Sequence, residues 1–206
     1  MTLDRLTRDY DLTSDEQAAF AAFDDLFTAT AAHTNLVARG TLPERWDRHY
    51  ADSLQLWPLL PDGATTLLDV GAGAGFPGIP LAILAHARRP DLRLTMADSV
   101  GKKARFIADA VATLRLRSAT ATNARVETLN ERYGVVTARA VAALPKLLGL
   151  CAPRLAPGGT LILPKGARAD EELAVARSDW RFEVSCVKSR TDEAASILVI
   201  TDLERR

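Results

Sequence analysis

Apolar residues recur at helical spacing in the first third of the chain. Thr13 and Glu16 form a capping-box pattern, which predicts that a helix starts there. The apolar positions that then share one helical face are Phe20, Phe23, Leu26 and Phe27. A second helix is expected to open at Pro43, and its apolar stripe is Trp46, Tyr50, Leu54 and Trp57. Residues 1–62 are therefore expected to form a helical cap packed on the remainder of the chain.

The pattern changes after Thr65, where short apolar runs alternate with stretches of helical periodicity. Strands are expected at 66–70, 92–98, 118–122, 134–139 and 160–164, and helices at 78–87, 101–115 and 143–152. The last two apolar runs, 181–188 and 195–202, are separated by a polar turn and predict an antiparallel pair. Alternating strands and helices indicate a parallel sheet covered on both faces. Residues 63–206 are thus expected to form the α/β core of a single domain spanning 1–206.

The segment from Leu67 to Gly78 reads as a buried strand, a glycine-rich turn and the start of a helix. Gly73, Gly75 and Gly78 match the G-x-G-x-x-G pattern, which is weak evidence when it stands alone. Asp69 is the discriminating residue, because a carboxylate there can accept hydrogen bonds from a cationic ligand and would be a poor neighbour for a pyrophosphate. This favours S-adenosylmethionine as the ligand. A nucleotide cofactor, or a tight turn with no ligand, remains the alternative.

The next apolar run ends in Asp98, at the tip of the second expected strand. An acid in that position can bind the two hydroxyl groups of a ribose. Asp98 is therefore expected to hold the ribose of the same ligand.

The segment after the fourth strand limits which chemical groups could accept the methyl group. Enzymes that methylate amino groups of bases usually carry an Asp/Asn-Pro-Pro-aromatic stretch there, whereas residues 135–140 read Val-Val-Thr-Ala-Arg-Ala. Cys151 lies about a dozen residues further on, a poor match for the nucleophile of pyrimidine C5 methylation. Guanine N7 fits better, because its lone pair is free and catalysis then rests on positioning and electrostatics. Arg139 is the candidate catalytic residue, in contact with guanine O6, a phosphate or the donor's carboxylate.

The composition limits the class of protein. The chain has 206 residues, of which 48% are hydrophobic and 25% charged, as in soluble globular proteins, and a cytoplasmic location is expected. Its formal net charge of zero gives no sign of nucleic-acid binding. Cys151 and Cys186 read as reduced core thiols, and Arg88 with Arg89 as a solvated helix end. The three histidines lie far apart, so no metal is expected, and the lack of an obvious apolar face favours a monomer.

These residues together resemble the RsmG (GidB) family, bacterial methyltransferases that act on guanine N7 of small-subunit ribosomal RNA. The resemblance runs from about Asn35 to Val199 and is most specific in residues 75–81, Gly-Phe-Pro-Gly-Ile-Pro-Leu. The other matching motifs are Asn35-Leu36, Arg48-His49 with Asp52-Ser53, Asp98-Ser99, Lys102-Lys103, Arg105-Phe106, Arg125-Val126-Glu127, Arg139-Ala140 and Lys165-Gly166. It implies a Rossmann-like class I S-adenosylmethionine-dependent methyltransferase fold, with a mostly parallel seven-stranded sheet and one antiparallel strand.

The resemblance also implies roles for individual residues. It adds Gly71, Phe76, Asp98, Val126, Glu127 and Arg139 to the glycine-loop residues Asp69, Gly73 and Gly75 as the expected donor-binding residues. The residues expected to contact RNA or the acceptor base are Arg48, His49, Asp52, Ser53 and Lys165. The implied partner is 16S rRNA, in the small ribosomal subunit or an assembly intermediate. Whether Arg139 serves the donor or the base stays open.

Two departures from the family pattern leave other functions in play. The helix before Asn35 lacks the usual Asn and Trp, and Ala194-Ala195 precedes the last strand where an arginine is common. Both departures concern RNA contact. A methyltransferase for a small molecule, or a ribosome-binding protein that keeps the donor pocket as a sensor, are the alternatives.

Overall fold

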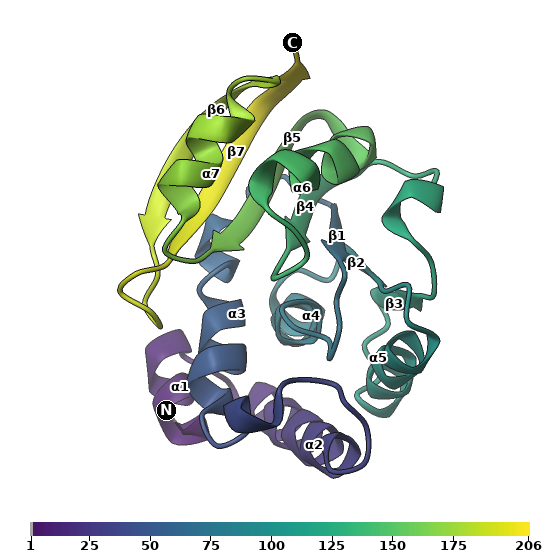
Figure 1. The fold of residues 1–206 in the computed structure, drawn as a ribbon. Helices are drawn as coiled ribbons and strands as arrows, with labels where there is room; N and C mark the ends of the chain where they lie inside the picture. Colours follow the sequence, from purple (N-terminus) through teal and green to yellow (C-terminus); the bar gives the residue numbers. More distant parts are fainter. Residues whose placement is uncertain (1) are drawn as a thin grey trace.

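The computed structural model describes residues 2–206, apart from the side chain of Arg39 (Figure 1). Its first helices are α1 (Leu3–Tyr10) and α2 (Ser14–Ala31). The capping box is present: the Thr13 hydroxyl accepts from the backbone of Glu16, whose carboxylate accepts from the backbone of Thr13. The three phenylalanines of the predicted apolar face are fully buried, which confirms the periodicity of this helix.

The second helix of the cap differs from the expected α-helix at Pro43. The chain forms a π-helix over Trp46–Ala51, continues as α3 (Asp52–Leu54), and ends in a 3₁₀ turn over Trp57–Leu59. The wider π turn lets two consecutive side chains, His49 and Tyr50, both pack on Phe76, each with ring centroids 5.1 Å from it. The irregularity therefore serves the packing of the cap against the glycine loop.

A seven-stranded sheet follows the cap, as expected. Its strands are β1 (Thr66–Val70), β2 (Arg93–Ala97), β3 (Ala119–Thr122), β4 (Tyr133–Ala138), β5 (Leu155–Lys165), β6 (Trp180–Lys188) and β7 (Ser196–Arg205). Their order is β3-β2-β1-β4-β5-β7-β6, and β7 is antiparallel to both of its neighbours. The mostly parallel sheet with one reversed strand is thereby confirmed. The remaining helices are α4 (Gly78–Arg88), α5 (Gly101–Thr113), α6 (Leu144–Cys151) and α7 (Ala169–Ala176).

The start of the fifth strand was misplaced by the sequence pattern. Strand β5 begins at Leu155 rather than at Thr160, although Pro157 and Gly158 read as a turn. The pairing of β4 with β5 shifts register after Tyr133, so this segment continues the strand through an irregularity.

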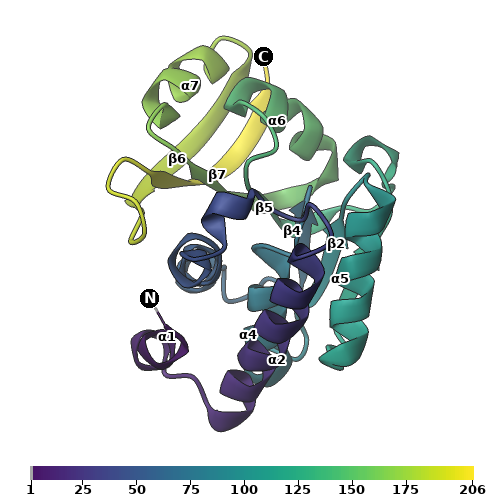
Figure 2. The ribbon, with the colours of Figure 1, turned by 60° about the horizontal axis from the view of Figure 1, so that its bottom comes forward.

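Alternate residues of the central strands face two apolar cores. Leu67 and Val135 face a core shared with α2, α4 and α5, whereas Leu68 and Val136 face one shared with α6 and α7. Figure 2 shows the same two layers on opposite sides of the sheet. Both faces of the parallel strands are therefore covered, and the loops at the carboxyl ends of these strands are left to form a site.

Arg88 is not the solvated helix end that its sequence context suggests. Its guanidinium donates to both oxygens of the buried Glu16 carboxylate, at 2.6 and 2.7 Å, and to the carbonyls of Tyr10 and Asp11. Burial raises the pKa of Glu16, but hydrogen bonds from Arg88 and Thr13 outweigh that effect and hold this pKa below its usual range. This ion pair joins the helical cap to α4.

The two cysteines lie in different surroundings. Cys151, the last residue of α6, is buried as expected, but Cys186 is exposed, so the prediction of two core thiols was wrong for Cys186. Cys186 belongs to β6, one of the two edge strands of the sheet, which has a neighbour on one side only. No helix in the described part of the chain has the length and apolar character needed to cross a membrane.

Candidate active site

The loop between β1 and α4 brings bare backbone to the carboxyl end of the sheet. Gly71, Gly73 and Gly75 have φ values of 66°, 61° and 83°, in the left-handed region that favours glycine. The N–H of Gly71 donates to the carbonyl of Ala97, at the end of β2, at 2.8 Å. A Cβ on Gly71 would lie 2.7 Å from a methyl group of Val141. The loop conformation therefore requires glycine.

Two carboxylates fix this loop from behind. Asp69 is fully buried, and its Oδ2 accepts from the N–H of Gly78 at 2.8 Å. Burial raises the pKa of Asp69 to about 7, although the bond from Gly78 opposes the shift. Asp98 accepts from the N–H groups of Gly73 and Val100, both at 2.8 Å. Both acids thus order the backbone at the start of α4 and at the glycine loop.

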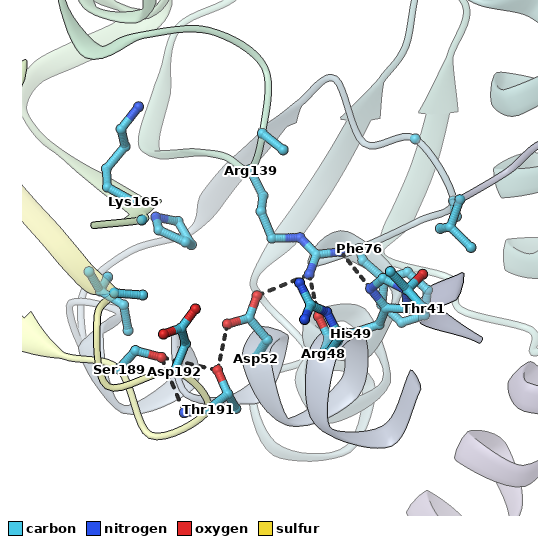
Figure 3. A pocket seen from close by; sticks show the side chains of 18 of the residues that line it. Thr41, Arg48, His49, Asp52, Phe76, Arg139, Lys165, Ser189, Thr191 and Asp192 are labelled. Carbon is cyan, nitrogen blue, oxygen red and sulfur yellow. Dashed lines mark hydrogen bonds and ion pairs between the residues drawn. The ribbon is translucent and has the colours of Figure 1, made fainter. Parts of the chain in front are cut away.

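A cavity of about 650 Å³ opens beside the glycine loop (Figure 3). Its walls come from five parts of the chain: residues 36–55 of the cap, the glycine loop, Lys103 of α5, the ends of β4 and β5 with the start of α7, and the turn between β6 and β7. The charged and aromatic side chains in these walls are Arg48, His49, Asp52, Phe76, Lys103, Arg139, Lys165, Arg168, Glu172 and Asp192.

Arg139, which follows β4, connects the sheet to the cap. Its Nη1 donates to Oδ2 of Asp52 at 2.9 Å and to the carbonyl of Arg48 at 2.8 Å. Its Nη2 lies 3.4 Å from Nδ1 of His49, and its guanidinium stands 5.7 Å from the ring centroid of Phe76. Arg139 is 18% exposed at its side chain, so the ion pair is largely shielded from water.

His49 is held neutral in this arrangement. Burial and the charge of Arg139 lower the pKa of His49 to about 4. A neutral ring whose Nδ1 accepts from Arg139 must carry its proton on Nε2, which lies 3.0 Å from the hydroxyl of Thr41. The Thr41 hydroxyl in turn donates to the carbonyl of Ala38 at 2.7 Å. Every proton in this chain of contacts therefore has an acceptor.

Asp52 carries the network on to the β6–β7 turn. Its second oxygen, Oδ1, accepts from the Thr191 hydroxyl at 2.9 Å and from the Gln55 amide at 2.8 Å. The buried Gln55 also accepts the backbone N–H of Arg190 at 2.9 Å. Arg139, Asp52 and this turn are thus parts of one connected polar system.

Lys165 is engaged at the far wall of the cavity. Its ammonium lies 2.6 Å from Oε2 of Glu172 and donates to the carbonyl of Ala142 at 3.1 Å. The same Glu172 oxygen accepts the N–H of Leu144 at 2.7 Å. This set ties the start of α6 to α7 behind the cavity.

A family model described as rRNA small subunit methyltransferase G (GidB) matches residues 16–197. A ribosomal RNA small subunit methyltransferase G from Acidiphilium cryptum is 43% identical over 187 residues, covering 89% of this chain and 84% of the relative. Another, from Methylobacterium sp. (strain 4-46), is 40% identical over 205 residues, covering 97% and 95%. The chain belongs to the rRNA small subunit methyltransferase G family.

Solved structures of other methyltransferases share the fold. An O-methyltransferase from Bacillus cereus in complex with SAH covers 97% of both chains, with a TM-score of 0.59 and 12% identity. A precorrin-6y C5,15-methyltransferase from Geobacter metallireducens covers 82% of this chain and 92% of its own, with a TM-score of 0.53 and 18% identity. The class I methyltransferase fold expected from the resemblance is confirmed for this family member.

The residues predicted to serve the site divide into three groups. Those that line the cavity are Arg48, His49, Asp52, Gly71, Gly73, Phe76, Arg139 and Lys165. Those that support it from behind are Asp69, Gly75 and Asp98. Val126 is buried in the core beside α6, while Glu127 is exposed on the turn between β3 and β4. Donor contact by Val126 and Glu127 therefore stays a prediction from the family resemblance.

Three expectations change with the geometry. Ser53 is fully buried and donates to the carbonyl of His49, so its hydroxyl serves the helix and does not face RNA. Lys165, with 9% of its side chain exposed, is paired with Glu172 instead of open to RNA. Asp69 has no exposed surface for a cationic ligand and acts on the loop through Gly78. In each case, tertiary burial decides the role.

Sequence reasoning missed the residues from the turn between β6 and β7. Ser189, Thr191 and Asp192 line the cavity together, and Gln55 anchors their turn from the cap. The only local signal was the spacing of Asp52 and Gln55, three positions apart on one helix. Their partners lie more than 130 positions away in the chain, beyond any local pattern.

Proposed function

We propose that this protein transfers the methyl group of S-adenosylmethionine to N7 of one guanine in 16S rRNA. The family and the names of its relatives support ribosomal RNA of the small subunit as the acceptor. The finer assignment, to N7, rests on how the titratable groups of the cavity are used.

Among the cavity groups that could act as a base, His49, Asp52 and Glu172 are occupied, whereas Asp192 forms no ion pair among the described residues. Both ring nitrogens of His49 have partners, and the carboxylates of Asp52 and Glu172 are paired with Arg139 and Lys165. Cys151 lies in the core outside the cavity, and burial raises the pKa of its thiol to about 12. Guanine N7 needs neither a base nor a nucleophile, because its lone pair is free to attack. This engagement of His49 and Asp52 is the observation that carries the proposal.

The residues beside the cavity fit the donor. A Cβ built on Gly73 would meet only the carbonyl of Gly71, at 3.7 Å, so this part of the loop presents open backbone to the cavity. Gly71, Gly73 and Phe76 would hold the donor, with Asp98 beside its ribose. When bound, S-adenosylmethionine supplies an electrophilic methyl group. Arg139 would orient the bound groups from the opposite wall and keep water from them.

Arg48 is the best-placed residue for RNA contact. It lines the cavity, yet 59% of its side chain is exposed. An exposed guanidinium at the rim can pair with a phosphate, and such contacts weaken as salt rises. We expect Arg48→Ala to lower RNA affinity without changing affinity for the donor.

The test is transfer of labelled methyl from S-adenosylmethionine to small ribosomal subunits from cells that lack this protein. Naked 16S rRNA and an extract of small metabolites run in parallel, and the modified base is mapped. Label on a single guanine N7 supports the proposal, with activity that falls as salt rises. Label confined to a metabolite, or donor binding without any transfer, would replace it with a small-molecule enzyme or a sensor.

A matched pair of valine variants checks that the transfer uses the proposed pocket. Gly73→Val adds a side chain where the backbone lines the cavity, so we expect donor binding and transfer to be lost. Gly63→Val adds the same side chain where no atom lies within 4 Å, and we expect it to behave as the unmodified protein. Equal donor affinity in the two variants would contradict the placement of the pocket.

A further inference from the structure

The turn between β6 and β7, residues 189–195, forms one wall of the cavity. Figure 3 shows Ser189, Thr191 and Asp192 on one side of Arg139, with Phe76 and His49 on the other. The turn is held by the cap: Thr191 donates to Asp52 at 2.9 Å, and the backbone of Arg190 donates to Gln55 at 2.9 Å. A side chain on this turn is therefore presented to the cavity from a fixed position.

Asp192 differs from the other carboxylates that line the cavity. Asp52 is paired with Arg139 and Glu172 with Lys165, whereas Asp192 forms no ion pair among the described residues. Its Oδ1 accepts the N–H of Ala194 at 3.0 Å, which shapes the turn, and its side chain is exposed at the cavity wall. Oδ2 of Asp192 has no hydrogen-bond partner among the described residues. A carboxylate oxygen in this position is an acceptor without a matching donor among the described residues.

We propose that Asp192 recognises the target guanine by accepting hydrogen bonds from its N1–H and N2–H groups. This inference rests on the proposed function. In guanine, N7 lies on the Hoogsteen edge of the purine, and the N1–H and N2–H donors lie on the adjacent Watson–Crick edge. When N7 faces the glycine loop, those donors are turned toward a neighbouring wall of the cavity, and the β6–β7 turn with Asp192 forms such a wall. A carboxylate with two oxygens matches two adjacent donors.

The same contact gives selectivity for guanine. Adenine presents an unprotonated N1 in place of the N1–H donor, so a carboxylate at Asp192 would face a lone pair. Sites built to hydrogen-bond a substrate reject analogues that leave the site's polar group unpaired. Negative charge from Asp192 also favours a base that becomes cationic when N7 is methylated. Asp192 is thus placed as a specificity-determining residue.

The experiment pairs one protein change with one change in the base. Asp192→Asn keeps a side-chain oxygen for the bond to Ala194 but replaces one acceptor with a donor. Inosine in place of the target guanine keeps N1–H, O6 and N7 and removes only the N2 amine. The kcat/KM for methylation is measured with guanine and inosine substrates prepared by RNA ligation. Glu193→Gln is the control, since the neighbouring carboxylate is exposed and does not line the cavity.

The unmodified enzyme and Glu193→Gln are expected to prefer guanine to inosine by about tenfold, the scale of one good base contact. Asp192→Asn is expected to lose about tenfold or more in kcat/KM on guanine and most of that preference, with donor affinity unchanged. Asp192→Ser, which keeps an oxygen for the turn and removes the charge, is expected to give the same loss of preference.

Three outcomes would overturn the inference. An Asp192→Asn or Asp192→Ser variant with the original guanine preference removes Asp192 from recognition and leaves the proposed function standing. The same conclusion follows if the unmodified enzyme methylates inosine as well as guanine. An unmodified enzyme that methylates neither RNA at N7 ends both proposals together.

Discussion

Asp52 and Arg139 lie 87 positions apart in the chain and form an ion pair of 2.9 Å across the cavity. One residue comes from the helical cap and the other from the end of β4, so the pair joins the two parts of the molecule that enclose the site. Their side chains are only 20% and 18% exposed, which limits screening by water. The pair is therefore expected to matter more than an ordinary surface contact.

A double-mutant cycle measures this coupling. Asp52→Ala and Arg139→Ala are each expected to lower the free energy of unfolding, and the double variant to lose less than the sum. We expect an interaction energy of about 1–2 kcal/mol, because each single change leaves a shielded charge unpaired. Urea unfolding of the four proteins gives the value.

The exposed pair Arg48 and Glu44 provides the control cycle. These side chains are 3.9 Å apart and 59% and 68% exposed, so a coupling of no more than about 0.5 kcal/mol is expected. Equal coupling in the two cycles would show that burial does not strengthen the Asp52–Arg139 pair.

The ion pair between Arg88 and Glu16 gives a second prediction. Glu16 is 2% exposed at its side chain, and Arg88→Met would leave its carboxylate buried with only the capping-box contact to Thr13. We expect a loss of about 3 kcal/mol in the free energy of unfolding. Arg117→Met, at an exposed position, is the matched control and should change stability little. Similar unfolding midpoints for the two variants would rule out a stabilising role for the pair.

Local patterns predicted the sheet and the glycine loop well. The alternation of apolar runs placed the strands of the core, and three glycines marked the turn, because these features depend on neighbours in the sequence. The π-helix at Trp46 was not predictable in this way. In this helix His49 and Tyr50 both pack on Phe76, and that contact forms only in the folded chain.

The part of the cavity wall formed by Lys165 and the β6–β7 turn was not predictable for the same reason. Gln55 contacts Thr191 across 136 positions, and nothing in the polar turn from Ser189 distinguishes it from an ordinary surface loop. Lys165 shows the opposite error, since a lysine after a strand suggests an exposed contact until Glu172 is placed beside it. Charge in the sequence indicates what a residue can bind but not what it already binds.

The buried His49 predicts a dependence of stability on pH. Its pKa is lowered from 6.5 to about 4 by burial and by Arg139. Between these values the unfolded chain binds a proton at His49 that the folded chain does not, so the free energy of unfolding rises with pH across this window. The difference of about 2.5 pKa units corresponds to about 3 kcal/mol. Most of this contribution should be lost as the pH falls from 7 to 4.

The measurement compares the unmodified protein with His49→Asn by chemical unfolding at several pH values. Asp69 acts in the opposite direction, because its raised pKa of about 7 makes the folded chain bind a proton more readily than the unfolded chain. Since both proteins contain Asp69, its contribution cancels in the difference. A difference that stays constant between pH 7 and 4 would mean that His49 is not held neutral.

The glycine loop gives the last prediction, through two glycine-to-alanine changes with opposite surroundings. Gly71 has φ of 66°, and a Cβ there would lie 2.7 Å from Val141, so alanine adds both backbone strain and a steric clash. We expect a loss of about 1–3 kcal/mol in the free energy of unfolding and weaker donor binding. Gly149 lies within α6 with no atom within 4 Å of its Cβ position, so alanine there is expected to stabilise the protein by about 0.5–1 kcal/mol. Thermal unfolding and titration with S-adenosylmethionine test both variants. If Gly71→Ala matched Gly149→Ala in both measurements, the left-handed turn at Gly71 would not be required for the donor site.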